Sequence, residues 1–269
     1  MGGFASANEA LKLKARRSEA AGSILDCVGM TPLVLVERCL PPLPDVEIFA
    51  KLELFNPGGS LADRCVSGGN GAGQTSWGGD AGVSMAMAGA ALGRPVRGRV
   101  ASSVTATHRR AMSSFGAEVA PCEGAVGSSY PVNADQVRSL AREIYDQTCG
   151  RLTHVVAYGG WASALTREIV PHVPSLVAVE VAFLDPTPGD AAAGPGVVSI
   201  LRAAAQSWAS KLHGEGLRAG PISGLVLAGG VKVAAELVAR GESGMIVCLF
   251  ADRAWLQTGP ALVPRPPVW

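Results

Sequence analysis

The sequence lacks the features of several classes of protein. Its formal net charge is only +1 over 269 residues and it has no basic run, so nothing favours a nucleic acid partner. It has no uninterrupted apolar stretch of the roughly 18 residues that a membrane span needs, so no membrane association is expected. Residues 1–21 also lack the apolar core of a signal peptide.

Cysteine and histidine are too dispersed to build a metal site. The six cysteines are scattered, form no Cys-x-x-Cys pair and have no metal-ligand spacing with histidine. Reduced, mostly buried thiols are typical of a cytoplasmic protein. We therefore expect a cytoplasmic protein without a bound metal.

What the sequence does contain is an alternation of short apolar strands and helices. Residues 46–54 alternate with the period of a strand, and residues 83–92 form an alanine- and methionine-rich helical pattern. Three further apolar runs are typical of buried parallel strands: 152–157, 176–181 and 245–250. This order predicts an α/β protein with doubly wound parallel sheets and helices on both faces.

Several segments carry a resemblance to one family. Residues 56–64 read Asn-Pro-Gly-Gly-Ser-Leu-Ala-Asp-Arg, and residues 23–34 contain a Thr-Pro-Leu turn before a strand. Together with residues 143–154 and 251–259, they resemble the cysteine synthase and cystathionine β-synthase family, closest to the cysteine synthase B branch. These are fold type II enzymes that use pyridoxal phosphate (PLP). The resemblance implies two doubly wound parallel-sheet domains with an interdomain cleft.

The same resemblance implies a domain division and an assembly. The small α/β domain would span residues 46–140, and the large one residues 10–45 plus 141–259. Residues 260–269 contain four prolines and would form a C-terminal tail. A homodimer is expected.

Ala62 departs from the family at the position that matters most. The resemblance places there the lysine that holds PLP covalently. A methyl group cannot form that bond, carries no proton to move and is no nucleophile. The expectation from this residue is therefore that the protein uses no cofactor.

By the same resemblance, four other segments or residues of the cofactor site also differ from the family. The substrate-carboxylate loop aligns with residues 77–82 and loses its hydroxyls, while Asp80 adds a negative charge. Two like charges at about 4 Å repel by roughly 4 kcal/mol at an effective dielectric of about 20, which disfavours an ordinary amino-acid substrate. The phosphate loop aligns with residues 157–163 and is two residues short, Ala251 replaces the group facing the pyridine nitrogen, and residues 124–140 are shortened.

Aromatic residues were gained at these positions. Trp77, Tyr158 and Trp161 would either fill the space that PLP leaves or line a cleft for a small apolar or conjugated molecule. Filling and lining use the same residues, so both interpretations stay open. The predicted substrate-binding residues are Trp77, Gly78, Gly79, Ala62, Ser60, Tyr158, Trp161 and Ala251.

Asp80 is the candidate catalytic residue. A carboxylate walled by tryptophan would have a raised pKa suited to acid–base catalysis. An aspartate in the first turn of a helix is also ordinary, so a capping role is the alternative. His108, His172 and His213 show no partner in the sequence.

These observations lead to three functional hypotheses. The first is a PLP-independent, cofactor-free enzyme of specialised metabolism that catalyses a cyclisation, isomerisation or elimination. The second is a non-catalytic pseudoenzyme that binds a partner protein or regulates cysteine metabolism. The third is a remnant cysteine synthase or lyase activity with PLP.

Overall fold

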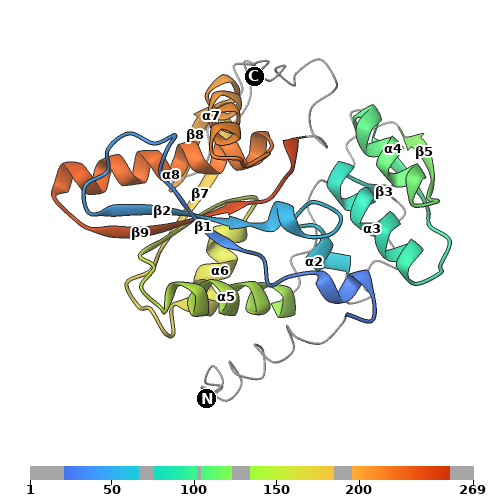
Figure 1. Ribbon diagram of the computed structural model, residues 1–269, viewed down its shortest axis with the longest axis horizontal. Coiled ribbons are helices and arrows are strands. Elements are labelled where there is room, and N and C mark those ends of the chain that lie inside the picture. Colours follow the sequence, from blue (N-terminus) through green and yellow to red (C-terminus); the bar gives the residue numbers. More distant parts are fainter. Residues whose placement is uncertain (1–20, 67–75, 102–103, 123–133, 185–195, 255–269) are drawn as a thin grey trace.

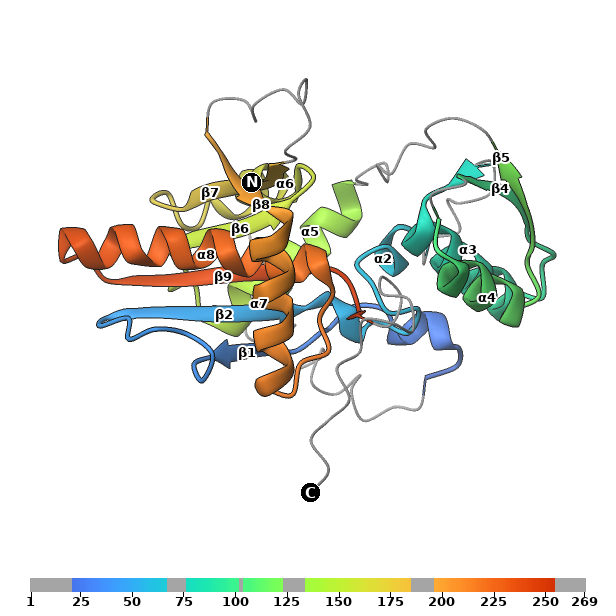
Figure 2. The ribbon, with the colours of Figure 1, turned by 90° about the horizontal axis from the view of Figure 1, so that it is seen from above.

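The chain folds around two separate β-sheets (Figures 1 and 2). A six-stranded sheet has the order β1-β2-β9-β6-β7-β8, and a three-stranded sheet has the order β3-β4-β5. The computed structural model describes residues 21–66, 76–101, 104–122, 134–184 and 196–254.

The larger sheet is parallel except at one edge. Only β1 (Leu33–Val36) runs antiparallel to its neighbour. The remaining strands, in sheet order, are β2 (Val46–Leu52), β9 (Gly244–Phe250), β6 (His154–Tyr158), β7 (Val177–Leu184) and β8 (Val197–Leu201). The three apolar runs predicted as buried parallel strands are confirmed as β6, β7 and β9.

Helices cover both faces of this sheet, as the alternating pattern predicts. One core joins β6 and β9 to α5 (Ala134–Thr148) and α6 (Trp161–Ile169). The other core joins the opposite face to α7 (Arg202–Gly214) and α8 (Pro221–Arg240). Figure 1 shows the two helix pairs on opposite sides of the strands.

Helix α8 is a core helix despite its apolar composition. Its 20 residues are long and apolar enough to cross a membrane by length and composition alone. However, 61% of that stretch is buried inside the protein. A Cβ at Gly230 would lie 2.5 Å from Cys248 Sγ, so the helix backbone packs directly on β9.

The smaller sheet consists of three short parallel strands, β3 (Ser76–Trp77), β4 (Arg97–Ala101) and β5 (Glu118–Cys122). Its helices are α3 (Gly79–Ala91) and α4 (Ala106–Ser114). A Cβ at Gly82 would lie 2.3 Å from Met112 Cε, so these helices approach closely because residue 82 is glycine. The helix predicted at residues 83–92 is α3, which begins four residues earlier, at Gly79.

Strand β2 belongs to the larger sheet. It pairs with β9 along its whole length, from Val46 to Leu52. The predicted domain boundary at residue 46 placed this strand in the small domain instead. The division into residues 46–140 and 10–45 plus 141–259 otherwise stays a prediction. Residues 10–20 and the tail 260–269 lie outside the described residues.

Candidate functional site

The segment that carries the resemblance is built around Asn56. It follows β2 and a short 3-10 helix, η2 (Glu53–Phe55), and leads into α2 (Asp63–Val66). The buried Asn56 amide donates to Glu53 O at 2.9 Å, to Glu53 Oε2 at 2.8 Å and to Ser60 O at 3.2 Å. Its Oδ1 accepts from Gly29 N at 2.8 Å. One side chain therefore fixes both ends of the turn.

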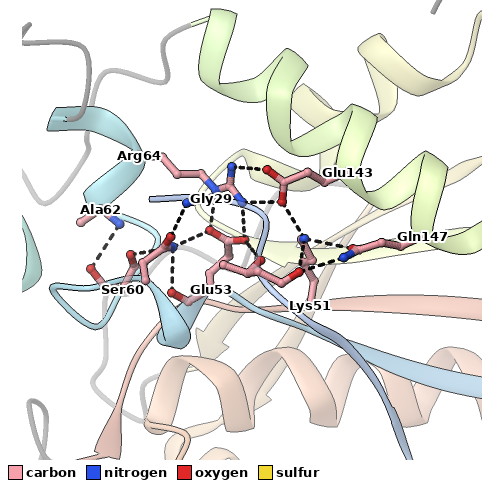
Figure 3. A network of polar contacts seen from close by, with 10 residues as sticks. Gly29, Lys51, Glu53, Ser60, Ala62, Arg64, Glu143 and Gln147 are labelled. Carbon is pink, nitrogen blue, oxygen red and sulfur yellow. Dashed lines mark hydrogen bonds and ion pairs between the residues drawn. The ribbon is translucent and has the colours of Figure 1, made fainter. Parts of the chain in front are cut away.

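A buried ionic network supports this turn (Figure 3). Arg64 Nε donates to Glu53 Oε2 at 2.6 Å, and its Nη2 donates to Glu143 Oε2 at 2.8 Å. All three side chains are at most 6% exposed. Burial alone would raise the pKa of Glu143, but hydrogen bonds and charge from Arg64 and Lys51 lower it to about 2. Glu143 is therefore a carboxylate at neutral pH.

Lys51 belongs to this network. Its Nζ donates to Thr31 O and Glu143 Oε2, both at 2.7 Å, and to Gln147 Oε1 at 3.0 Å. Burial lowers the pKa of Lys51, and the charges of Glu143 and Glu53 oppose that shift. Three bonds use all three donors of an ammonium group. The amine thus has a structural role.

Ala62 lies at the start of α2, beside Ser60. Its methyl group is buried, and its N–H donates to Ser60 Oγ at 3.2 Å. Ala251 joins them because its carbonyl accepts from Leu61 N at 3.1 Å. Figure 3 shows Ala62 and Ser60 together on the side of Arg64 away from Lys51. The structure therefore brings three of the predicted site residues together.

Asp63 connects this segment to the smaller sheet. Its Oδ2 accepts from Gly58 N at 2.5 Å and its Oδ1 from Ser84 Oγ of α3 at 2.5 Å. Burial, with a smaller effect from the charge of Asp80, raises the pKa of Asp63 to about 6 against those two hydrogen bonds. A Cβ at Gly58 would lie 2.4 Å from Asp63 Oδ1, which explains the glycine.

Asp80 has a partner that sequence reasoning missed. It lies in the first turn of α3, after the N-cap Gly78, and its Oδ1 is 3.1 Å from His108 Nε2. His108 Nδ1 is 2.7 Å from Thr105 Oγ1. The ring packs on the helix start, since a Cβ at Gly79 would lie 2.8 Å from it. The sequence shows no partner for His108, and the structure corrects this: its partner is Asp80. The two residues are 28 positions apart, so no local pattern reveals the contact.

The loop between β6 and α6 holds a carboxylate. Gly159 and Gly160 both adopt positive φ, at 73° and 86°. Glu180 of β7 accepts from Gly160 N at 3.2 Å and from Ser163 N at 2.9 Å. Successive glycines of this kind before a helix form a concavity of amide groups that suits an anion.

The aromatic residues near this loop have different environments. Trp161 is 6% exposed and packs in the core with Leu61, so its indole fills space. Tyr158 is 39% exposed, and its ring lies 6.1 Å from that of Phe183. The side chain of Trp77 lies outside what the structure describes. For Trp161, the structure therefore supports the interpretation that the ring fills space and not that it lines a cleft.

The sequence matches the family described as "Pyridoxal-phosphate dependent enzyme" over residues 24–181. The chain belongs to this PLP-dependent family. A cysteine synthase from Aquifex aeolicus (strain VF5) is 32% identical, and the match covers 87% of this chain and 90% of that one. Family membership therefore rests on most of the sequence.

Solved structures of two other proteins show the same fold. O-ureido-L-serine synthase, in a lysine-to-alanine variant with O-ureido-L-serine bound, has a TM-score of 0.73 at 22% identity, covering 88% of this chain and 92% of that one. O-acetyl serine sulfhydrylase isoform 3 from Entamoeba histolytica has a TM-score of 0.70 at 20% identity, covering 88% and 90%. The fold type II prediction is confirmed.

These findings overturn the first functional hypothesis. A PLP-independent cyclase, isomerase or lyase of specialised metabolism is wrong, because the chain belongs to a PLP-dependent family and matches a cysteine synthase. The match to enzymes also disfavours the hypothesis of a non-catalytic pseudoenzyme. Of the three, the comparisons favour a cysteine synthase activity with PLP.

The described residues fit one part of PLP and not another. The amides of Gly160 and Ser163 donate to the Glu180 carboxylate, so this loop can bind an anionic group. Residue 62 carries no amine, and Lys51 is fully engaged elsewhere. The loop amides thus suit an anionic group, and residue 62 offers no covalent tether.

Proposed function

We propose that this protein is a cysteine synthase-like, PLP-dependent enzyme of the sulfhydrylase type. It would replace an O-linked leaving group on a serine derivative with sulfur. The family match and the 32% identity to a cysteine synthase support this function. The observation that carries it is the segment from Asn56 to Arg64, which keeps the family's Asn-Pro-Gly-Gly-Ser turn and is held by the buried side chains of Glu53 and Glu143.

Ala62 stands, in this proposal, at the position of the family's PLP-binding lysine. PLP, when bound, supplies an electron sink for the reacting carbon. Non-covalent contacts alone would hold it here, and residue 62 would transfer no proton.

The start of α3 is proposed to receive the substrate carboxylate. Backbone amides at a helix N-terminus attract an anion. The Asp80 carboxylate, which would repel that anion, lies 3.1 Å from His108 Nε2. A hydrogen bond or ion pair with His108 offsets its charge, so Gly78, Gly79 and Ala81 remain compatible with an amino acid.

A lysine at residue 62 tests this assignment. Ala62→Lys should raise cysteine formation from O-acetylserine and sulfide, with PLP present, by about 10²- to 10⁴-fold, the usual contribution of a positioned acid–base group. It should also give the visible absorbance band of lysine-bound PLP, which the unchanged protein should lack.

Ala203→Lys is the matched control, because residue 203 is exposed on α7. It should leave both the rate and the spectrum unchanged. If neither the natural protein nor Ala62→Lys forms cysteine while both remain folded, the sulfhydrylase assignment is wrong. If Ala62→Lys is active but shows no band, the position assigned to the lysine is wrong.

A further inference from the structure

Among the described residues, helices cover only one face of the smaller sheet. Its strands lie in chain order, β3-β4-β5, so right-handed crossovers place α3 and α4 on the same side. On that side Val100 of β4 packs in one core with Val83 of α3 and Met112 of α4. Successive residues of a strand point to opposite sides, so the neighbours of Val100 in β4 lie on the other face.

That other face, called the outer face below, consists of Arg97, Arg99, Glu118 and Ala120, which are all exposed. The strand register places Arg97 beside Glu118 and Arg99 beside Ala120, so the four side chains form two adjacent rows. Parallel sheets almost always have helices on both faces. In the part of the chain that the structure describes, the second cover of this sheet is missing.

The outer face is positively charged. Arg97 Nε lies 2.8 Å from Glu118 Oε2, so these two charges balance. Within the described residues, the Arg99 guanidinium has no hydrogen bond or ion pair. Residues 76–101 and 104–122 contain five arginines and two acidic residues, whereas the whole chain has a net charge of only +1. The positive charge is thus concentrated around this sheet, and a complementary partner is acidic.

We propose that the outer face docks an acidic amphipathic helix of a partner protein. The helix supplies the second cover that a parallel sheet takes. Its apolar stripe lies on Ala120 and on the aliphatic stems of the two arginines, and its acidic side chains pair with the Arg99 guanidinium. The exposed carboxylate of Glu118 on the same face disfavours a nucleic acid, whose phosphates are charged along the whole strand.

The longer helices of this chain do not match the outer face, which argues against a second copy as the partner. Helix α7 has no acidic residue, and α8 has Glu236 against Lys232 and Arg240. Both exposed acidic residues of α5 are paired with arginines of the same helix. The acidic residue of α3, Asp80, is held by His108. Among the described residues, a second copy therefore offers no acidic helix.

The experiment measures binding of a dye-labelled synthetic peptide by fluorescence anisotropy. The peptide has about 18 residues, five helical turns, with leucines on one side of the helix and glutamates on the other. We expect it to bind the natural protein, and a version with lysines in place of the glutamates not to bind. Arg99→Glu should weaken binding about tenfold, because an attraction becomes a repulsion.

Arg110→Glu is the matched control. Residue 110 is exposed on α4, which packs on the opposite face of the sheet, and the substitution makes the same change of charge. It should change binding by less than about twofold. Should Arg99→Glu fail to fold by circular dichroism, Arg99→Gln replaces it and should weaken binding about threefold.

Three results would overturn the proposal. The first is no binding of the glutamate peptide, or equal binding of the lysine peptide. The second is an equal loss in the position-99 variant and in Arg110→Glu, which would indicate a general effect of charge. The third is a dimer in sedimentation that the position-99 substitution dissociates, which would assign the outer face to a second copy. None of these measurements depends on PLP or on cysteine formation.

Discussion

At the scale of single residues, Glu143 does most to hold the signature segment in place. It comes from α5, 79 residues after Arg64, and bonds both Arg64 and Lys51. Its pKa of about 2 shows that these two cations outweigh its burial. Buried charges of this kind are stable only while every partner is present.

Removing Glu143 should therefore be costly. Glu143→Ala leaves two buried cations with one fewer counter-charge, and the free energy of unfolding should fall by about 3–5 kcal/mol. The folded pKa lies below the ordinary value of 4.5, so the stabilisation is complete above that pH and is lost as the pH falls towards 2. Urea unfolding at pH 7 and pH 3 measures both effects, and the deficit should shrink at pH 3.

Asp146→Ala is the control on the same helix. Asp146 is 48% exposed and faces Arg142 at 3.8 Å, so its loss should cost less than about 1 kcal/mol. Equal losses for the two variants would contradict a special role for the buried frame.

At the scale of elements, α8 is capped by a residue from the end of β9. Asp252 accepts from Ile222 N at 3.1 Å, Ser223 N at 2.8 Å and Ser223 Oγ at 2.7 Å. It is fully buried, and burial raises its pKa to about 6 despite these bonds. A Cβ at Gly220 would lie 2.3 Å from Asp252 Oδ2, so the cap also requires that glycine.

This cap should make stability depend on pH. Between the ordinary pKa of 3.8 and the folded value of about 6, the folded chain holds the proton more tightly, so stability falls as the pH rises through that window. Asp252→Asn removes the titrating group. Relative to this variant, the natural protein should lose up to about 3 kcal/mol between pH 4 and pH 6.5 in chemical unfolding. A pH-independent difference between the two would contradict the raised pKa.

At the scale of the whole molecule, the bond between Asp63 and Ser84 connects the two sheets through α2 and α3. Ser84→Ala should cost about 1–3 kcal/mol, because it leaves a buried carboxylate oxygen without its donor. It should also raise the pKa of Asp63 above about 6, since the lost hydrogen bond lowers it. Urea unfolding and carboxyl NMR titration measure these effects, and Ser210→Ala, exposed on α7, should show neither.

The sequence predicted the fold better than the site. Strand and helix periods depend on neighbouring residues, so β6, β7 and β9 could be predicted, together with the presence of helices on both faces of the sheet. The contacts of Asp80 with His108, and of Glu180 with Gly160, join residues 20 or more positions apart, and no local pattern reveals them.

The prediction of cofactor-free chemistry failed for a related reason. It gave Ala62 and its altered neighbours more weight than the resemblance that runs through most of the chain. The homodimer, a partner protein and a small apolar ligand stay predictions. So does the interdomain cleft, because residues 67–75 and 102–103 lie outside the described residues.

Strand β9 lies between β2 and β6, although it is the last strand in sequence among the described residues. On the ribosome, β2 and β6 are made first and cannot join until residues 244–250 emerge between them. Each nascent half-sheet thus carries an open edge that a neighbouring chain could extend. A messenger RNA truncated before codon 244 would give a chain without β9, in which the edges of β2 and β6 stay unpaired, and this chain should aggregate.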